Sequence, residues 1–165
     1  MATSDIADIA EQIKQQMGDK WLPHIYAQRV VRLRTRPYKF AKPRPTARIT
    51  IQHTLLGIEL KIGRQRLLCP DLATARYLSV FARAGCREIA IPYDITKISH
   101  LADELESSWY RMLLLVEQHM QSETDRFAAR LRHLLFANIR DELQAADRGR
   151  GENKEVLRNL DSHVD

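Results

Sequence analysis

Apolar residues recur at helical spacing near the start of the chain and again in its middle. Isoleucines three or four residues apart predict an amphipathic helix over residues 4–17, which Gly18 would end. After Pro70, Asp71 can cap a second helix, and the apolar spacing carries this helix to a natural stop at Gly85. Two separate helices are therefore expected in the first half of the chain.

Two longer helices follow, joined by a short polar segment. Asp94 opens the first, and its apolar spacing extends roughly to Gln121. Residues 122–125 resemble a capping box with Asp in place of Glu, after which a last helix runs to about Ala146. Because the join between them is short, the two helices are predicted to form an antiparallel helical hairpin.

Alternating apolar and polar residues over 47–69 predict a small antiparallel meander. The alternation changes phase just before Gly57, which places a turn or bulge there. A second turn at 63–65 leads to a third short strand. Residues 88–91 predict one further strand, ended by a proline.

The segment before the meander combines a short alternation with prolines. Val31 and Leu33 alternate with arginines, which predicts an edge strand with a basic outer face. The stretch 36–45 holds three prolines, and because proline lacks a backbone N–H, a helix or a central strand is excluded there. An extended arm or a long loop is expected instead.

These elements predict an α+β fold. Its parts are a small antiparallel sheet (a three-stranded meander plus one further strand), an N-terminal helix, a central helix and a long C-terminal helical hairpin. Residues 1–146 are expected to form a single α+β domain with a basic, proline-rich arm at about 29–48, and 147–165 a flexible polar tail. With 165 residues, 44% of them apolar, the chain can bury one core without disulfides or metal.

The basic charge is concentrated in one segment. The chain has 26 Lys+Arg against 21 Asp+Glu and a net charge of +5. From Lys20 to Gly57 there is no acidic residue but nine basic ones, so this segment carries +9 and the remainder −4. Such asymmetry points to an anionic partner. A membrane surface is disfavoured because the arm has no amphipathic helical pattern.

The first functional hypothesis is a non-enzymatic module that contacts nucleic acid, DNA or RNA, mainly through phosphates. Basic side chains would release counterions, the two arm aromatics could stack on bases, and the prolines would keep the arm extended. An acidic protein surface is the competing partner. The alternative without a specific ligand is a basic loop that packs on its own chain or on a partner subunit, or that is simply solvated. The candidate binding residues are Arg29, Arg32, Arg34, Arg36, Tyr38, Lys39, Phe40, Lys42, Arg44 and Arg48.

The alternative function is an oligomeric adaptor or assembly protein whose basic arm docks on an acidic partner. In the first long helix, apolar residues at alternating steps of four and three form a heptad seam. This seam could join two copies in a homo-oligomer, or it could pack inside one chain against the last helix and the sheet. The candidate seam residues are Ile98, Leu105, Trp109, Met112 and Val116.

No catalytic or cofactor-binding motif is recognised, so neither an enzyme nor a cofactor is expected. Glycine-rich phosphate loops, GxSxG and HExxH are absent. His100, Asp103 and Glu104 share one helical turn but lack a fourth ligand, so an exposed charged face is preferred to a metal site. Cys69 and Cys86 lack CxxC spacing and suit buried free thiols.

The remaining observations bear on location and surface. The N-terminus lacks the features of a secretory signal, and no apolar run is long enough to cross a bilayer. Two cysteines do not make a disulfide framework, so a reduced, cytoplasmic protein is expected. No membrane partner is expected. Arg126, Arg130 and His133 on the last helix could extend a basic surface, although a solvated helix face is the preferred interpretation.

Overall fold

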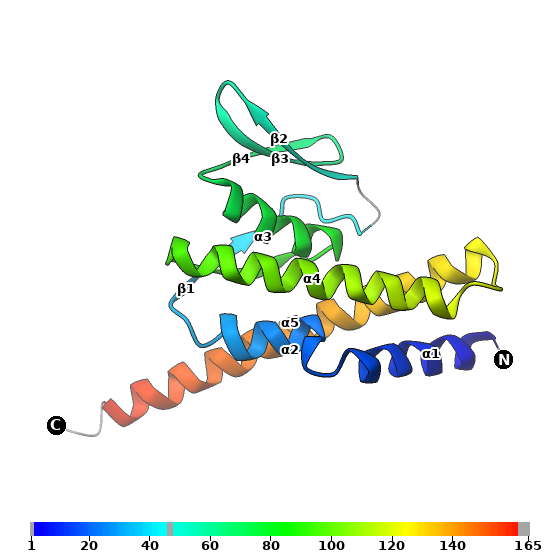
Figure 1. Ribbon diagram of the computed structural model, residues 1–165. Helices are drawn as coiled ribbons and strands as arrows, with labels where there is room; N and C mark the ends of the chain where they lie inside the picture. Colours follow the sequence, from blue (N-terminus) through cyan, green and yellow to red (C-terminus); the bar gives the residue numbers. More distant parts are fainter. Residues whose placement is uncertain (1, 46–47, 162–165) are drawn as a thin grey trace.

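Helices and short strands follow one another as an α+β fold. The computed structural model describes the backbone of residues 2–45 and 48–161, and the side chains of 5–45 and 48–149. The elements are α1 (Ala2–Met17), the 3-10 turn η1 (Gly18–Lys20), α2 (Leu22–Ile25), the π-helical η2 (Tyr26–Val30), β1 (Thr35–Lys39), β2 (Ile49–Thr54), β3 (Gly57–Ile62), β4 (Gln65–Cys69), α3 (Leu72–Arg83), β5 (Glu88–Pro92), α4 (Ile95–His119) and α5 (Asp125–Asp161). In Figure 1 the meander lies over α3 and α4, and α1, α2 and α5 lie on the other side of those helices.

Local signals correctly predicted most helix starts. The Asp71 carboxylate accepts a hydrogen bond from the Thr74 N–H at 2.7 Å, which caps α3. Asp94 does the same for Thr96 at 3.0 Å at the start of α4. The last helix differs: Thr124 caps it through the N–H of Phe127 at 3.3 Å, so the predicted capping box at 122–125 is not the one used.

The predicted meander is confirmed as an antiparallel sheet in the order β2-β3-β4. Alternate residues of these strands face α3, and Leu60 at the centre is fully buried. Gly57 lies just after the β2–β3 turn with a φ of +129°, a conformation that favours glycine. The phase change in the sequence was therefore the signal of a real turn.

The further strand, β5, does not join the meander. It pairs with β1 in a separate two-stranded antiparallel sheet. The predicted edge strand at 31–34 is wrong. The π-helical η2 continues to Val30, with Tyr26 and Val30 both completely buried, and the chain then turns before β1 begins at Thr35. The strand begins four residues later, inside the proline-rich arm.

Pro37 fits inside β1 because of its register. It lies opposite Ala90, and the Phe40 N–H donates to the Arg87 carbonyl at 2.9 Å. Hydrogen-bonded and non-hydrogen-bonded pairs alternate along an antiparallel ladder, so the Pro37–Ala90 pair is non-hydrogen-bonded. The missing N–H of proline therefore costs the ladder nothing, and β1 is an edge strand, where proline is tolerated.

The heptad seam is buried within this chain. Its five candidate residues have side chains no more than 4% exposed, and Trp109 stacks on Phe136 of α5 with ring centroids 4.9 Å apart. Ser108 beside the seam donates a hydrogen bond to the Lys20 carbonyl. The packing corresponds to the intramolecular alternative, and these side chains are not available to a second copy.

The last helix is longer than the sequence predicted. Its backbone continues past Ala146 to Asp161, so residues 147–161 of the expected flexible tail are helical, and 162–165 lie outside the described residues. Asp147 belongs to the body, because its carboxylate accepts a hydrogen bond from the Tyr26 hydroxyl at 2.7 Å. The polar composition that indicated a tail also contains good helix formers and no proline.

The arm lies close against the rest of the fold at Gly85. This glycine has a φ of +75°, and a Cβ placed on it would lie 2.9 Å from the Cβ of Pro45 and 3.0 Å from the Pro45 backbone nitrogen. Such contacts are too short for real Cβ atoms. The arm therefore crosses the end of α3 at a point where only glycine fits.

This close contact predicts an unequal cost for two glycine substitutions. Gly18 also has a positive φ, +54°, but a Cβ there meets nothing within 4 Å. Gly18→Ala should lower the free energy of unfolding by about 1–2 kcal/mol, the cost of a left-handed backbone. Gly85→Ala should cost clearly more in urea denaturation, because Pro45 must also move. Equal losses would mean that the arm does not rest on Gly85.

Candidate nucleic-acid interface and the adjoining cleft

The basic arm is an ordered part of the fold at both ends. β1 pairs with β5, Phe40 is only 8% exposed, and Pro45 lies against Gly85. After residues 46–47, which lie outside the described residues, the chain enters β2 with the buried side chain of Ile49. The arm thus consists of the end of η2, the strand β1 and a loop that crosses the end of α3.

The charges of the arm face solvent. Of its eight basic candidates, Arg29 alone forms a salt bridge with a described residue, Glu104. Arg34 lies over the ring of Tyr93, 5.0 Å from its centroid, in a cation–π contact that keeps its charge exposed. The remaining side chains are exposed and form no salt bridge among the described residues: Arg32, Arg34, Arg36, Lys39, Lys42, Arg44 and Arg48.

The two arm aromatics are turned inward. Phe40 is buried and packs edge-to-face on Tyr38 with ring centroids 5.1 Å apart. Tyr38 is half-buried, and burial raises the pKa of its hydroxyl. Phe40 is therefore not available for base stacking in this structure. The interleaved basic and aromatic residues did not predict this burial, because Phe40 follows the end of β1 and turns into the core.

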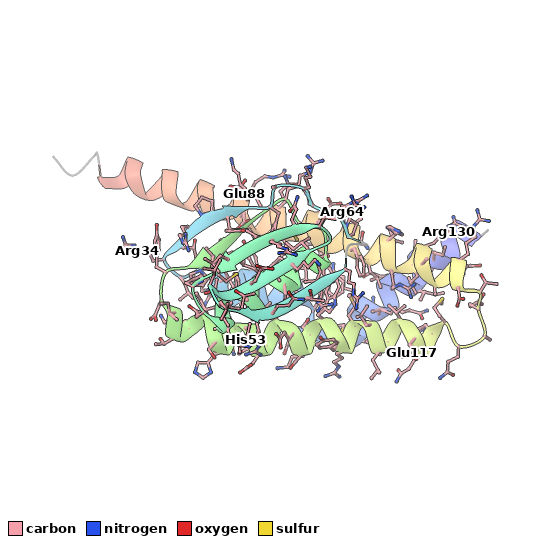
Figure 2. All side chains as sticks on the ribbon, turned by 90° about the horizontal axis from the view of Figure 1, so that it is seen from above. Arg34, His53, Arg64, Glu88, Glu117 and Arg130 are labelled. Carbon is pink, nitrogen blue, oxygen red and sulfur yellow. The ribbon has the colours of Figure 1, made fainter. Side chains whose placement is uncertain are left out.

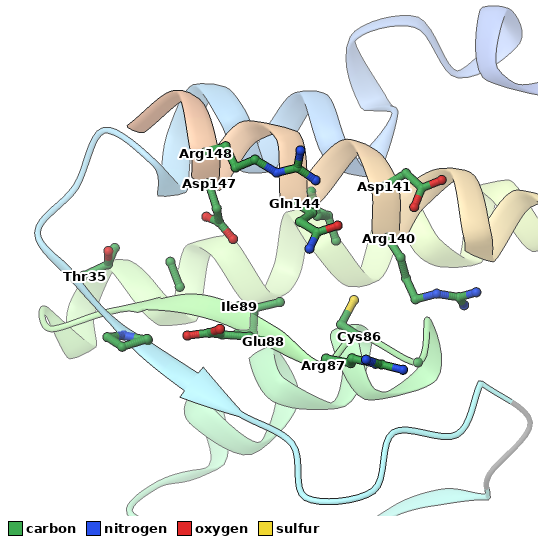
Figure 3. A pocket seen from close by; sticks show the side chains of 14 residues that line it. Thr35, Cys86, Arg87, Glu88, Ile89, Arg140, Asp141, Gln144, Asp147 and Arg148 are labelled. Carbon is green, nitrogen blue, oxygen red and sulfur yellow. The ribbon is translucent and has the colours of Figure 1, made fainter. Parts of the chain in front are cut away.

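A cleft of about 760 Å³ opens between the two-stranded sheet and α5 (Figure 3). Arg140 and Gln144 project from α5 toward Cys86 and the neighbouring residues of β5. Arg148 lies further along the same helix. None of these three residues was a predicted site residue, although steps of four along a helix indicate one face.

Two tyrosines complete the hydrogen bonds of β5 beside this cleft. The Ala90 N–H donates to the Tyr26 hydroxyl at 2.8 Å, and the Tyr77 hydroxyl donates to the Ala90 carbonyl at 2.6 Å. Tyr26 in turn donates to Asp147 on α5 at 2.7 Å. Burial and the Asp147 carboxylate raise the pKa of Tyr26, so its hydroxyl keeps the proton that it donates.

The Tyr26 hydroxyl predicts a measurable stability cost. Tyr26→Phe leaves a buried backbone N–H and a carboxylate without this partner, so it should lower the free energy of unfolding by about 1–3 kcal/mol. Tyr38→Phe is the matched control, since no hydrogen bond of the Tyr38 hydroxyl is found among the described residues. Urea denaturation of both variants checks the prediction, and a Tyr26→Phe variant as stable as the control would contradict it.

Charges of both signs line the cleft. Arg87, Arg140 and Arg148 form no salt bridge among the described residues, and Arg140 donates to the Ala84 carbonyl at 2.8 Å. Asp141 and Asp147 contribute carboxylates from α5, and Glu88 contributes one from β5. The cleft therefore offers guanidinium donors and carboxylate acceptors within one opening.

Cys86 contributes little reactivity to the cleft. Its side chain is 4% exposed, and burial raises the pKa of the thiol to about 12. A thiol that holds its proton at neutral pH is a poor nucleophile and a poor metal ligand. Cys69 is also buried and free.

The acidic cluster on α4 forms ion pairs within the chain. Glu104 pairs with Arg29, and Asp103 accepts a hydrogen bond from Arg76 at 2.5 Å. Glu106 also binds Arg76, at 2.9 Å. Within the described ranges, no group of three or more His, Cys, Asp or Glu side chains is placed to hold a metal ion. The carboxylates tie η2 and α3 to α4.

The basic residues of α5 divide into two groups. Figure 2 shows Arg130 and Arg34 near opposite ends of the molecule. Arg126 and Arg130 are exposed at the start of α5, whereas Arg140 and Arg148 line the cleft beside β5. The former pair therefore does not extend the surface of the arm. None of the described helices has both the length and the apolar character needed to span a membrane.

Comparison of the chain with protein-family models, curated proteins and solved structures found no match. A functional proposal therefore depends on the residues of the arm and the cleft alone.

Proposed function

We propose that the protein binds nucleic acid through the phosphate backbone, using the exposed cations of the arm. One observation carries the proposal: seven basic side chains project from a single segment without a salt bridge among the described residues. If the arm had evolved only to pack on its own chain, these charges would meet some of its acidic residues, as Arg29 does.

The physical basis is counterion release. Each Lys or Arg that replaces a condensed cation at a phosphate makes binding more favourable at low salt. Because β1 pairs with β5 and Pro45 rests on Gly85, the arm loses less conformational freedom on binding than a free tail would. The burial of Phe40 removes one of the two expected stacking residues, so phosphate contacts supply most of the affinity.

Removing two arm charges should reduce both affinity and salt dependence. Lys42→Gln with Arg44→Gln changes two exposed side chains that form no salt bridge among the described residues. Each lost contact should lower the slope of log K against log salt by about 0.9 on duplex DNA and about 0.7 on a single strand. Fluorescence anisotropy with labelled oligonucleotides at several salt concentrations measures the slope.

The matched control removes the same charge elsewhere. Arg126→Gln with Arg130→Gln lies at the start of α5, away from the arm, and should leave the slope unchanged. If both double variants behave alike, the arm is not the binding site. If the unaltered protein shows no salt-dependent binding, the proposed function is wrong, and an acidic protein surface becomes the partner to test.

A further inference from the structure

We infer that the cleft between α5 and the β1–β5 sheet receives one unstacked nucleotide, so that the protein prefers single-stranded nucleic acid to a duplex. This inference rests on the proposed function and specifies its ligand. It depends on the position, the size and the polar groups of the cleft.

The cleft is a continuation of the arm. Thr35 and Pro37 of β1 line it, and Lys39 on the same face of the strand lies opposite Glu88. At the other end, Pro45 contacts Gly85, which also lines the cleft. A strand of nucleic acid whose phosphates follow the arm therefore passes the opening.

Size distinguishes a single strand from a duplex. A volume of about 760 Å³ is in the range of pockets that hold one small ligand. In a duplex the bases are stacked and paired inside the helix, and to extrude one costs a few kcal/mol. The bases of a single strand are already free to splay into a protein pocket.

The polar groups of the cleft match the two parts of a nucleotide. Arg87 and Arg140 provide donors for a phosphate, and the hydrogen bond of Arg140 to the Ala84 carbonyl holds that guanidinium in place before binding. Gln144 and the carboxylate of Asp141 can pair with the edge of a base, since carboxylates accept from exocyclic amino groups and an amide both donates and accepts. Charges of both signs therefore fit a nucleotide better than they fit a bare phosphate.

The test compares three double variants that each remove two positive charges. The cleft variant is Arg87→Gln with Arg148→Gln, because both side chains are exposed and neither forms a salt bridge among the described residues. The arm variant is Lys42→Gln with Arg44→Gln, and the α5 control is Arg126→Gln with Arg130→Gln. Each is titrated by anisotropy with labelled single-stranded DNA, single-stranded RNA and duplex DNA of mixed sequence.

The cleft variant should bind single strands at least about tenfold more weakly than the control, because Arg87 can no longer donate a charge-assisted hydrogen bond to the phosphate. Its duplex binding should match that of the control. The arm variant should weaken binding to all three probes. A greater loss on RNA than on DNA would assign a cleft contact to the ribose hydroxyl, and equal losses would assign only phosphate and base contacts.

A second variant and a spectroscopic readout distinguish a lost nucleotide contact from a loss of folding. Gln144→Glu changes one exposed residue and places a negative charge in the cleft, so it should also weaken single-strand binding selectively. A single strand that carries an aminopurine should brighten on binding as that base leaves the stack, and this change should disappear in the Gln144→Glu protein.

Two results overturn the inference while leaving the proposed function intact. One is equal affinity of the unaltered protein for single strands and duplex. The other is a cleft variant that binds single strands as tightly as the control does. Absence of binding to every probe would overturn both the inference and the proposed function.

Discussion

The backbone of Ala90 is the point on which the rest of the structure depends. Its N–H and carbonyl point away from β1, where a third strand would normally pair. The hydroxyls of Tyr26 and Tyr77 occupy that place instead, and the Tyr26 hydroxyl donates a hydrogen bond to Asp147. Because a buried backbone group without a partner is costly, this arrangement ends the sheet at two strands and binds η2, α3 and α5 to its edge.

The arm derives its position from this closed edge. With one side of β5 occupied by tyrosines, the other side is free to pair with β1, and the arm is held there. Phe40 and Pro45 then fasten the loop that follows the strand. The apolar and backbone contacts hold the segment, and seven of its cations face solvent without a salt bridge among the described residues. The same edge forms one wall of the cleft, which places the proposed nucleotide pocket next to the proposed phosphate contacts.

Local chemistry made part of this fold predictable from the sequence. Asp71, Gly85 and the alternation around Gly57 act within a few residues of themselves, and the elements that they indicated are present. The strand in the arm was not predictable, since Pro37 is tolerated only through its register with Ala90, 53 residues later. The cleft was missed for the same reason: the sequence places Arg140 and Arg148 on one helix but does not tell which strand that helix faces.

Amide hydrogen exchange, followed residue by residue by NMR, tests the central claim most directly. If the tyrosines close the edge of β5 and the arm is thereby held, the amides of Ala90 and Phe40 should exchange as slowly as those inside α3. If these two amides exchange as fast as in an unstructured peptide while α3 remains protected, the arm is not held by this sheet. The ordered arrangement of the arm and cleft would then be contradicted.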